Sequence, residues 1–339
     1  MHRSEITIDL GALRRNVRRL RAVLGESELW AVVKADAYGH GAVDVAGTVL
    51  GEGATVLCVV TTGEALELRG EFPEARILIM GPTVGRELAT ARDARLEVAV
   101  FDTEIPEGVR VHLKLDTGMG RWGLSELPEP PVEVVGLMTH LATADSDPSF
   151  ARQQLQRFEE ATSRYSHLTR HAANSAAALR LPEARLDASR CGVALYGLSP
   201  FGGDPADDGL EPVLRWESRV AQVRELGPGE STGYGRRFSV DQPTWIGVVP
   251  IGYADGFRRD MTGTEVSVEG DRRRVVGAVS MDALAVELPE RLPVGTPVTL
   301  IGDGVLAEAH AAVAETINYE IVCRINSAPA RARRSVLDA

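Results

Sequence analysis

Eight short apolar runs recur along the first 190 residues, and they constrain the fold more than any other feature of the sequence. On average one begins about every 20 to 25 residues, and most are separated by segments of helix-forming composition. The runs are LWAVVK from residue 29, ATVLCVV from 54, ARILIM from 75, LEVAVF from 96, VRVHLKL from 109, VEVVGLMTH from 132, HLTRHA from 167 and ARLDASR from 184. Eight strands that alternate with helices predict an α/β fold of the (β/α)8 barrel (TIM barrel) type, whose functional groups lie at the carboxyl ends of the strands.

Residues 9–24 have the pattern of an amphipathic helix. Asp9 stands in the N-cap position, where a carboxylate accepts hydrogen bonds from the first backbone N–H groups. Apolar side chains follow at helical spacing at Leu10, Leu13, Val17, Leu20 and Leu24. We therefore predict a helix before the first strand of the barrel.

A break rich in Gly, Pro and Asp, GGDPADDG, divides the chain at about residue 205. Beyond it, strand-like runs such as TWIGVVPIGY and PVTLIG follow one another with no helical segment until AEAHAAVAETIN. We predict a barrel domain over residues 1–205 and a smaller, mainly β domain over residues 206–339. The strand-like residues 4–8 are a candidate to pack with the second domain.

The charge balance is acidic, with 48 Asp and Glu against 37 Lys and Arg and a net charge of -11. General binders of nucleic acid or anionic membranes carry the opposite sign, so we expect neither partner. Any anion bound here must be held by a few placed donors. The chain starts without an apolar signal core and contains no uncharged run long enough to cross a bilayer, which predicts a cytoplasmic protein.

The three cysteines, Cys58, Cys191 and Cys323, lie far apart and form no CxxC pair. This spacing argues against a zinc site and against a disulfide framework, so we expect no metal. We expect each of them to be a small buried hydrophobic side chain.

Lysine is nearly absent from the sequence. Two of the 37 basic residues are lysine, Lys34 and Lys114, and the other 35 are arginine. Lysine and arginine are interchangeable on a solvated surface. The two positions that kept lysine are therefore candidates for positions where arginine cannot replace it. A lysine amine loses its proton and attacks a carbonyl, whereas a guanidinium stays charged. Together with His140, His171 and Arg190, both lysines fall at or near predicted strand ends, where a barrel carries its active site.

The segment AVVKADAYGHG, residues 31–41, places Lys34 at a strand end before a Gly-rich turn with Tyr38. It resembles the pyridoxal-phosphate signature of the alanine racemase family. Further segments resemble blocks of the same family in the same order: LKLDTGMGRWG (113–123), THLATAD (139–145), HAANSAA (171–177), SRCGVALYG (189–197), GYGRRF (233–238), VPIGYADGF (249–257), SMD (280–282) and INYEIVCRI (317–325). The resemblance therefore covers both predicted domains.

The resemblance implies a pyridoxal 5'-phosphate-dependent isomerase that interconverts L-alanine and D-alanine and supplies D-alanine for peptidoglycan. Lys34 would hold the cofactor as an imine and then act as the base on one face of the substrate Cα. Tyr253 matches the base on the opposite face, which in this family comes from the other subunit of a homodimer. Neutral tyrosine, with a pKa of about 10, is a poor base, so nearby positive charge must help to ionise it. His140 and Arg190 match residues linked to that tyrosine through hydrogen bonds, and we expect both to supply positive character nearby.

Other roles also follow from the resemblance. Arg190 matches the residue that faces the pyridine nitrogen and leaves it unprotonated, because arginine has no proton to give. His171 would brace Arg190. Arg121 and the backbone of Met281 match contacts to the substrate carboxylate, and Lys114 matches a position that is carbamylated in some members. The cofactor contacts implied besides Lys34 are Tyr38, His140, Ser175, Arg190, Gly192, Val193 and Tyr319, and Asn174 supports them.

Three other functions stay open. A racemase for another amino acid, such as serine or lysine, is the hardest to separate, because Ala278 stands where the family often has an arginine at the substrate entrance. A decarboxylase on the same barrel plan would use a cysteine and a glutamate where this chain has Tyr253 and Arg190. A non-catalytic cofactor-binding protein would resemble the barrel alone.

Several aromatic and imidazole side chains have no such support. We interpret Trp30 and Phe158 as core residues, and Tyr234 as a residue that either faces the cofactor cavity or fills a turn. We interpret four histidines as surface or core residues without a role in the site: His2, His112, His167 and His310.

Overall fold

The computed structural model describes residues 2–338, and the chain divides into two compact units. Leu13–Phe201 and Asp208–Glu211 form the first, which we call the barrel unit. The residues up to Ala12, Gly202–Asp207 and the chain from Pro212 onward form the second, which we call the β unit.

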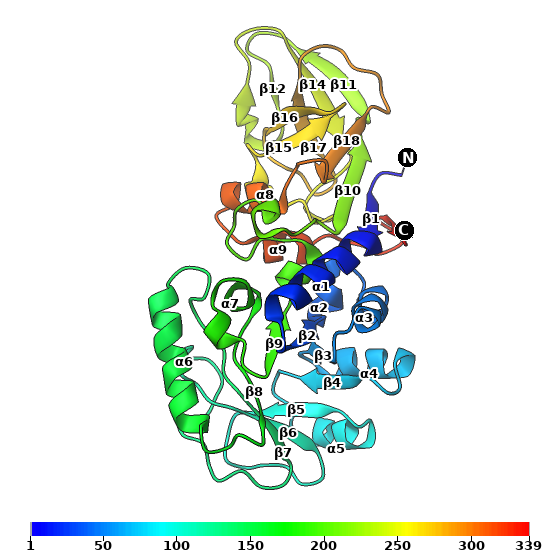
Figure 1. The fold of residues 1–339 in the computed structure, drawn as a ribbon. Coiled ribbons are helices and arrows are strands. Elements are labelled where there is room, and N and C mark those ends of the chain that lie inside the picture. Colours follow the sequence, from blue (N-terminus) through cyan, green and yellow to red (C-terminus); the bar gives the residue numbers. More distant parts are fainter. Residues whose placement is uncertain (1, 339) are drawn as a thin grey trace. The chain divides into compact units, whose positions relative to one another are not determined.

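Eight parallel strands close into a barrel within the barrel unit, with helices on the outside (Figure 1). Each strand overlaps one of the eight apolar runs in the sequence, so the predicted (β/α)8 barrel is confirmed. The strands are β2 (Glu28–Val32), β3 (Val56–Val59), β4 (Arg76–Ile79), β5 (Glu97–Val100), β6 (Arg110–Lys114), β7 (Val134–Met138), β8 (Thr169–His171) and β9 (Ala188–Cys191). The barrel closes where β9 pairs with β2, which places Glu28 opposite Ala188.

The helices before, between and after these strands are α1 (Leu10–Leu24), α2 (Lys34–Gly39), α3 (Ala42–Gly51), α4 (Thr62–Glu71), α5 (Arg86–Asp93), α6 (Pro148–Thr162) and α7 (Ser175–Arg180), with short 3-10 turns η1 (Pro182–Ala184) and η2 (Val193–Tyr196). Helix α1 confirms the predicted amphipathic helix. The carboxylate of Asp9 accepts the N–H of Ala12 at 2.9 Å, and Leu13, Val17 and Leu20 are fully buried. Residues 115–133, between β6 and β7, are a long loop instead of a helix.

Nine strands form one sheet in the β unit, in the order β11-β14-β17-β16-β15-β18-β10-β1-β19. Their bounds are β1 (Glu5–Asp9), β10 (Leu214–Arg219), β11 (Gln222–Leu226), β14 (Thr244–Val249), β15 (Glu265–Val268), β16 (Asp271–Val276), β17 (Leu284–Leu288), β18 (Pro297–Ile301) and β19 (Arg333–Leu337). Strand β1 pairs antiparallel with β10 and parallel with β19, so the first strand of the chain lies in the sheet of the β unit.

Shorter elements complete the β unit. They are the strands β12 (Ser231–Thr232) and β13 (Phe238–Ser239), the helices α8 (Ala307–Val313) and α9 (Asn318–Cys323), and the 3-10 turns η3 (Pro205–Asp208), η4 (Tyr234–Arg236) and η5 (Arg259–Met261). Asp208 at the end of η3 belongs to the barrel unit. Tyr234 lies on η4 and is 68% exposed.

The core residues largely follow the sequence pattern. Trp30 and Phe158 are fully buried, as predicted. Cys58 and Cys191 are buried, but Cys323 is exposed at the end of α9, so the expectation of burial was wrong for this residue. Within residues 2–338, no group of His, Cys, Asp and Glu side chains is arranged to hold a metal ion.

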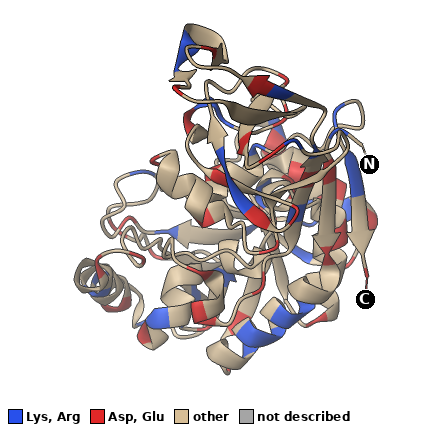
Figure 2. Ribbon diagram, turned by 90° about the horizontal axis from the view of Figure 1, so that it is seen from above, with Lys and Arg blue, Asp and Glu red and all other residues tan. Residues whose placement is uncertain are grey.

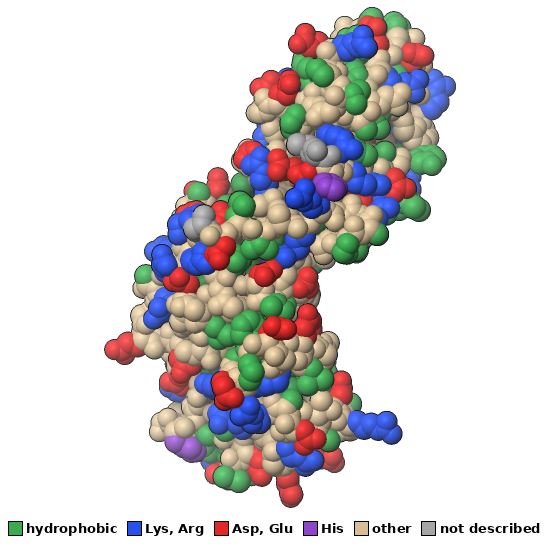
Figure 3. Space-filling view, turned by 90° about the vertical axis from the view of Figure 1, so that its right-hand side faces the viewer, with side chains coloured by type: hydrophobic (Ala, Val, Ile, Leu, Met, Phe, Trp, Pro, Cys, Tyr) green, Lys and Arg blue, Asp and Glu red, His purple; other side chains and the backbone are tan. Residues whose placement is uncertain are grey.

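Charged side chains of both signs are interspersed along the ribbon (Figure 2) and over the face drawn in space-filling form (Figure 3). No helix among the described residues combines the length and the apolar character needed to cross a membrane.

Candidate active site

Lys34 lies at the carboxyl end of β2, where the backbone turns in an unusual way. It is the first residue of α2, and the next four residues, Ala35 to Tyr38, have φ between 51° and 57° with ψ between 35° and 52°. These are left-handed helical values, which cost a residue with a side chain roughly 1–2 kcal/mol. Four such residues in succession persist only where surrounding contacts hold them, and strain of this kind is concentrated at functional sites.

Glu64 on α4 provides much of that support. One carboxylate oxygen accepts the backbone N–H of Ala35 at 2.7 Å, and the other accepts the N–H groups of Val60 and Thr61 at 2.9 and 3.0 Å. Burial raises the pKa of Glu64, but the hydrogen bonds from these backbone groups outweigh it and lower the pKa. A carboxylate from α4 thereby fixes the residue that follows Lys34.

Arg190 lies on β9 with its guanidinium buried and almost fully bonded. Nη1 donates to Nδ1 of His171 at 2.7 Å and to the carbonyl of the same residue at 2.8 Å. Nη2 donates to the carbonyls of Thr139 and Ala172 at 2.8 and 3.2 Å, with Nδ1 of His140 at 3.5 Å. Of the five guanidinium N–H donors, four are therefore used, and the structure shows no acceptor in residues 2–338 for the fifth, on Nε.

A chain of hydrogen bonds supports Arg190 from behind. Because Nδ1 of His171 accepts from Arg190, its Nε2 carries the proton and donates to Nδ1 of His112 at 2.9 Å. Nε2 of His112 then donates to the carboxylate of Glu97 at 2.8 Å. Burial opposes ionisation of Glu97, but hydrogen bonds from His112 and Arg76 outweigh it and lower its pKa to about 2. Each histidine is thereby held in one tautomer, with the proton on Nε2.

The two histidines in this series of hydrogen bonds, His112 and His171, are neutral near pH 7. Burial, followed by the charge of Arg190, lowers the pKa of His171 well below its ordinary value. Burial lowers the pKa of His112 despite its bond to Glu97. His112 was interpreted from the sequence as a surface or core residue without a role, and Glu97 was not considered. A signal was present, because His112 and Lys114 are two residues apart on β6 and so face the same side of the strand.

Lys114 and His140 lie beside the same arginine. Burial, followed by the charges of Arg121 and Arg190, lowers the pKa of Lys114 to about 8. Burial and the charge of Arg190 lower the pKa of His140 to about 3, so His140 is uncharged at neutral pH. The positive character expected at His140 is therefore absent. In the structure that charge comes from Arg190.

A small cup of hydrogen-bonding groups lies between Tyr38, Ser175 and the start of η2. Ser175 Oγ accepts the backbone N–H groups of Gly192 and Ala194 at 3.0 and 3.4 Å, which leaves its own proton to donate elsewhere. A Cβ at position 192 would lie 2.6 Å from the Tyr38 hydroxyl, so only glycine leaves room for it. Asn174 caps α7 by accepting the N–H of Ala177 at 3.0 Å, which fixes Ser175 at the start of that helix.

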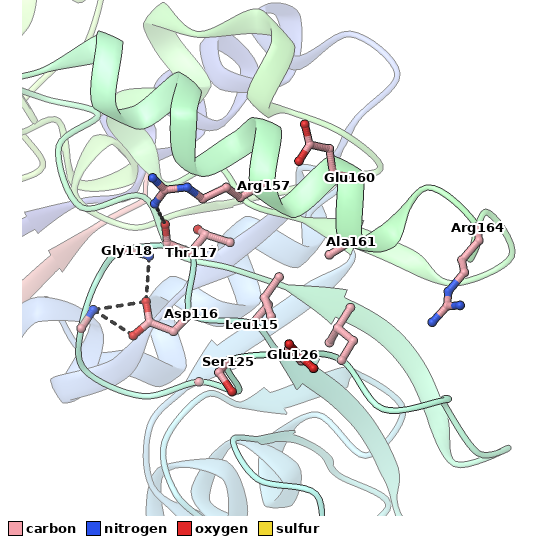
Figure 4. A pocket seen from close by; sticks show the side chains of 13 residues that line it. Leu115, Asp116, Thr117, Gly118, Ser125, Glu126, Arg157, Glu160, Ala161 and Arg164 are labelled. Carbon is pink, nitrogen blue, oxygen red and sulfur yellow. Dashed lines mark hydrogen bonds between the residues drawn. The ribbon is translucent and has the colours of Figure 1, made fainter.

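Arg121 is exposed on the loop between β6 and β7, and Asp116 shapes this loop. The carboxylate of Asp116 accepts the N–H groups of Gly118, Met119 and Gly120 at 2.8–3.2 Å. Behind the loop is an open cavity of about 940 Å³ between it and α6, where Arg157 donates to the carbonyl of Thr117 (Figure 4).

The β unit carries the remaining predicted site residues. Tyr253 and Met281 are 45% and 53% exposed, and Tyr319 lies on α9. Tyr253 borders a cavity of about 560 Å³ whose lining includes four arginines, Arg237, Arg258, Arg259 and Arg324. The surroundings of Tyr253 within its own unit are therefore rich in guanidinium groups.

Comparison with known proteins identifies the group of enzymes to which these features belong. Residues 8–200 match the family described as alanine racemase, N-terminal domain, and residues 213–333 match alanine racemase, C-terminal domain. The chain belongs to the alanine racemase family. The two matches together span both structural units.

Individual members of the family are similar over nearly the whole length. Alanine racemase 1 of Bacillus subtilis is 37% identical over 351 residues, which cover 94% of this chain and 90% of that protein. The alanine racemase of Streptomyces lavendulae, which produces D-cycloserine, has a solved structure with 34% identity and a TM-score of 0.92, covering 100% and 98% of the two chains. The biosynthetic alanine racemase of Pseudomonas aeruginosa gives 34% identity and a TM-score of 0.91, with both chains fully covered.

Alanine racemases depend on pyridoxal 5'-phosphate, and the barrel unit has groups that fit it. The uncommitted Nε–H of Arg190 suits the pyridine nitrogen, because it donates without giving up a proton. The cup is lined by the hydroxyl groups of Tyr38 and Ser175 beside Gly192, without an ammonium or guanidinium group, which suits a phosphate in an acidic protein. Lys34 supplies the amine at the adjoining strand end. The individual roles of these residues stay predictions.

Proposed function

We propose that this protein interconverts L-alanine and D-alanine with pyridoxal 5'-phosphate held by Lys34. The observation that carries the proposal is Arg190, whose guanidinium is fixed by four hydrogen bonds and keeps its Nε–H for an acceptor. A decarboxylase with a glutamate at this position would protonate the cofactor nitrogen, whereas arginine does not. The proposed product, D-alanine, serves peptidoglycan synthesis in the cytoplasm.

When bound, the cofactor withdraws electrons from the substrate Cα and so makes its proton easier to remove. Arg190 would orient the ring, and Tyr38, Ser175 and the backbone of Gly192 and Val193 would hold the phosphate together with Tyr319. Because Arg190 stays a hydrogen-bond donor, negative charge remains closer to Cα. Side reactions that need this charge to spread through the ring, such as transamination, would then be slower.

Inversion at Cα needs one group that removes a proton and another that returns one to the opposite face. We assign these two roles to Lys34 and to Tyr253 of the partner subunit of a homodimer. Arg121 and the backbone N–H of Met281 would bind the substrate carboxylate.

Racemisation is tested by incubating the holoenzyme with single L-amino acids in heavy water. We expect L-alanine to lose its optical rotation while its α-proton is replaced by deuterium. Faster turnover of serine or lysine would identify a racemase for another amino acid. Release of carbon dioxide without racemisation would contradict the proposal.

The second base is tested by Tyr253→Phe, which keeps the ring and removes the hydroxyl. We expect kcat for racemisation to fall by about a thousandfold, because one of the two proton transfers loses its acid–base group. The absorbance of the cofactor bound at Lys34 should stay unchanged, because that residue belongs to the barrel unit. Full activity in this variant would show that another group returns the proton.

A further inference from the structure

A buried carboxylate, Asp255, holds the turn that carries Tyr253. Its side chain is 1% exposed. One oxygen accepts the backbone N–H of Gly252 at 3.0 Å and a guanidinium N–H of Arg3 at 2.8 Å. The other oxygen accepts Nε–H of Arg331 at 2.9 Å. Asp255 therefore joins the residue before Tyr253 to two arginines from opposite ends of the sequence.

The pairing of the first and last strands brings these two arginines together. Strands β1 and β19 are parallel, and Glu5 lies opposite Arg333. Arg3 and Arg331 each stand two residues before these paired positions, so both reach the same end of the sheet. A carboxylate buried without a partner would be strongly destabilising. The two half-buried guanidinium groups compensate for the charge of Asp255 and so allow its burial.

The turn itself is pressed against the segment that contains Met281. The N–H of Tyr253 donates to the carbonyl of Ser280 at 3.1 Å, and that of Ala254 donates to the carbonyl of Met281 at 3.0 Å. A Cβ at Gly252 would lie 2.2 Å from the Ser280 carbonyl oxygen, so the two segments approach as closely as glycine permits.

The same arginines also hold the other segment. Nη2 of Arg331 donates to the carboxylate of Asp282 at 2.8 Å, and Arg3 donates to the carbonyl of Asp282 at 3.4 Å. Asp282 directly follows Met281. One network of charges thus fixes the turn of Tyr253 and the segment of Met281 relative to each other.

We propose that Asp255 is a positioning residue for Tyr253, and that the Arg3 and Arg331 contacts to it set where the tyrosine hydroxyl stands relative to the Met281 backbone. This rests on the proposed role of Tyr253 as one of the two bases. A proton transfer is sensitive to small displacements of the group that performs it, so the loss of this support should slow inversion more than it weakens substrate binding.

The test variant is Asp255→Asn, which keeps the size of the side chain but turns an NH2 group toward an arginine donor. In the cofactor-free protein, we expect amide hydrogen exchange over residues 252–257 to become about tenfold faster. In the holoenzyme, we expect kcat for inversion to fall by tenfold to about a hundredfold, with KM changed less than about threefold. In heavy water, the alanine enantiomer whose α-proton faces Lys34 should still exchange it with retention of configuration.

Two further variants complete the experiment. Asp303→Asn removes an exposed carboxylate that pairs with Arg215 elsewhere in the β unit, and it should behave as the unaltered protein. Arg331→Gln removes one arginine and keeps the contact of Arg3 with Asp255. It replaces Asp255→Asn as the test variant if Asp255→Asn does not fold, and we expect smaller changes in amide exchange and kcat in the same direction.

Unchanged amide exchange and an unchanged ratio of inversion to exchange in both Asp255→Asn and Arg331→Gln would overturn the proposal. If the unaltered enzyme neither inverts nor exchanges alanine, the proposed function fails instead. The amide exchange of the cofactor-free protein then still decides whether Asp255 positions the turn.

Discussion

Glu97 shows how one buried carboxylate fixes the chemistry of residues some distance away. Its charge keeps the proton of His112 on Nε2, which in turn sets the tautomer of His171 and leaves Nδ1 of His171 to accept from Arg190. Arg190 sets the same tautomers from the other end, because it can only donate to Nδ1 of His171; without an ionised Glu97, the Nε2–H of His112 would be buried with a weaker acceptor. The orientation of Arg190 would then be less well defined.

The stability of the protein should therefore depend on the ionisation of Glu97. Its pKa of about 2 lies below the ordinary value of 4.5, so its contribution is complete above about pH 4.5 and is lost as the pH falls toward 2. The shift corresponds to about 3 kcal/mol of unfolding free energy. We expect Glu97→Gln to lose about this amount at pH 7 and to flatten the stability profile between pH 5 and 2 in urea unfolding. The control Glu107→Gln changes an exposed glutamate and should retain the full profile; an unaltered profile in Glu97→Gln would refute the assignment.

Lys114 is a second residue whose surroundings alter its chemistry. With a pKa of about 8, about a tenth of its amine is uncharged at pH 7, and the uncharged amine adds carbon dioxide to give a carbamate with release of a proton. The carbamate carries a negative charge, so its contact with Arg121 and Arg190 changes from repulsion to attraction. We therefore predict that Lys114 is carbamylated.

Carbamylation is measurable by carbon NMR in ¹³C-bicarbonate, because the chain has two lysines and one N-terminal amine. The carbamate signal should increase between pH 7 and 8.5 as more amine becomes uncharged, and it should be missing from Lys114→Met. We expect this variant to raise KM for alanine about tenfold, or about 1.4 kcal/mol, because Arg121 loses its anchor. An identical spectrum in Lys114→Met would assign the signal to another amine.

At the scale of elements, the left-handed turn after β2 is the most unusual piece of backbone in the site. Neither Ala35 nor Ala37 has a side chain that favours positive φ, so local preference opposes the conformation. Its support comes from α4, where Glu64 accepts the N–H of Ala35, and the N–H groups of Val60 and Thr61 hold the Glu64 carboxylate in place. Tertiary contacts here override the intrinsic preference of the segment.

Removing this support should therefore loosen the lysine turn. We expect Glu64→Ala to lower the free energy of unfolding by about 2 kcal/mol, because it leaves backbone N–H groups without their acceptor. Cofactor affinity, followed by absorbance during dialysis, should fall about tenfold because Lys34 is less well placed. Glu67→Ala, an exposed glutamate on the same helix, is the matched control. Equal cofactor retention by the two variants would count against a role for Glu64 in the turn.

At the scale of the whole molecule, the proposed site needs residues from two chains. Lys34→Ala and Tyr253→Phe should each be inactive alone. In a mixed dimer, however, one site combines Lys34 of one chain with Tyr253 of the other. After subunit exchange at equal amounts, we expect about a quarter of the unaltered activity, since half of the dimers are mixed and each has one intact site. No recovery, despite exchange demonstrated by mass spectrometry, would contradict a shared site.

The sequence by itself determined the barrel, the mainly β second unit and the family. Apolar periodicity and ordered motifs depend on residues that are close in sequence, so they can be recognised without knowledge of the fold. It also made Lys34 the leading candidate for the cofactor lysine, since an amine in an arginine-rich chain is chemically distinct wherever it lies. The tertiary structure alone decided which groups hold the candidate site residues in place. Glu64, Glu97, His112 and Asp255 act through hydrogen bonds to residues distant in sequence or to backbone N–H groups, and such partners become visible only when the fold brings them within 3 Å. The neutral state of His140 was likewise decided by burial beside Arg190, which no spacing along the chain reveals.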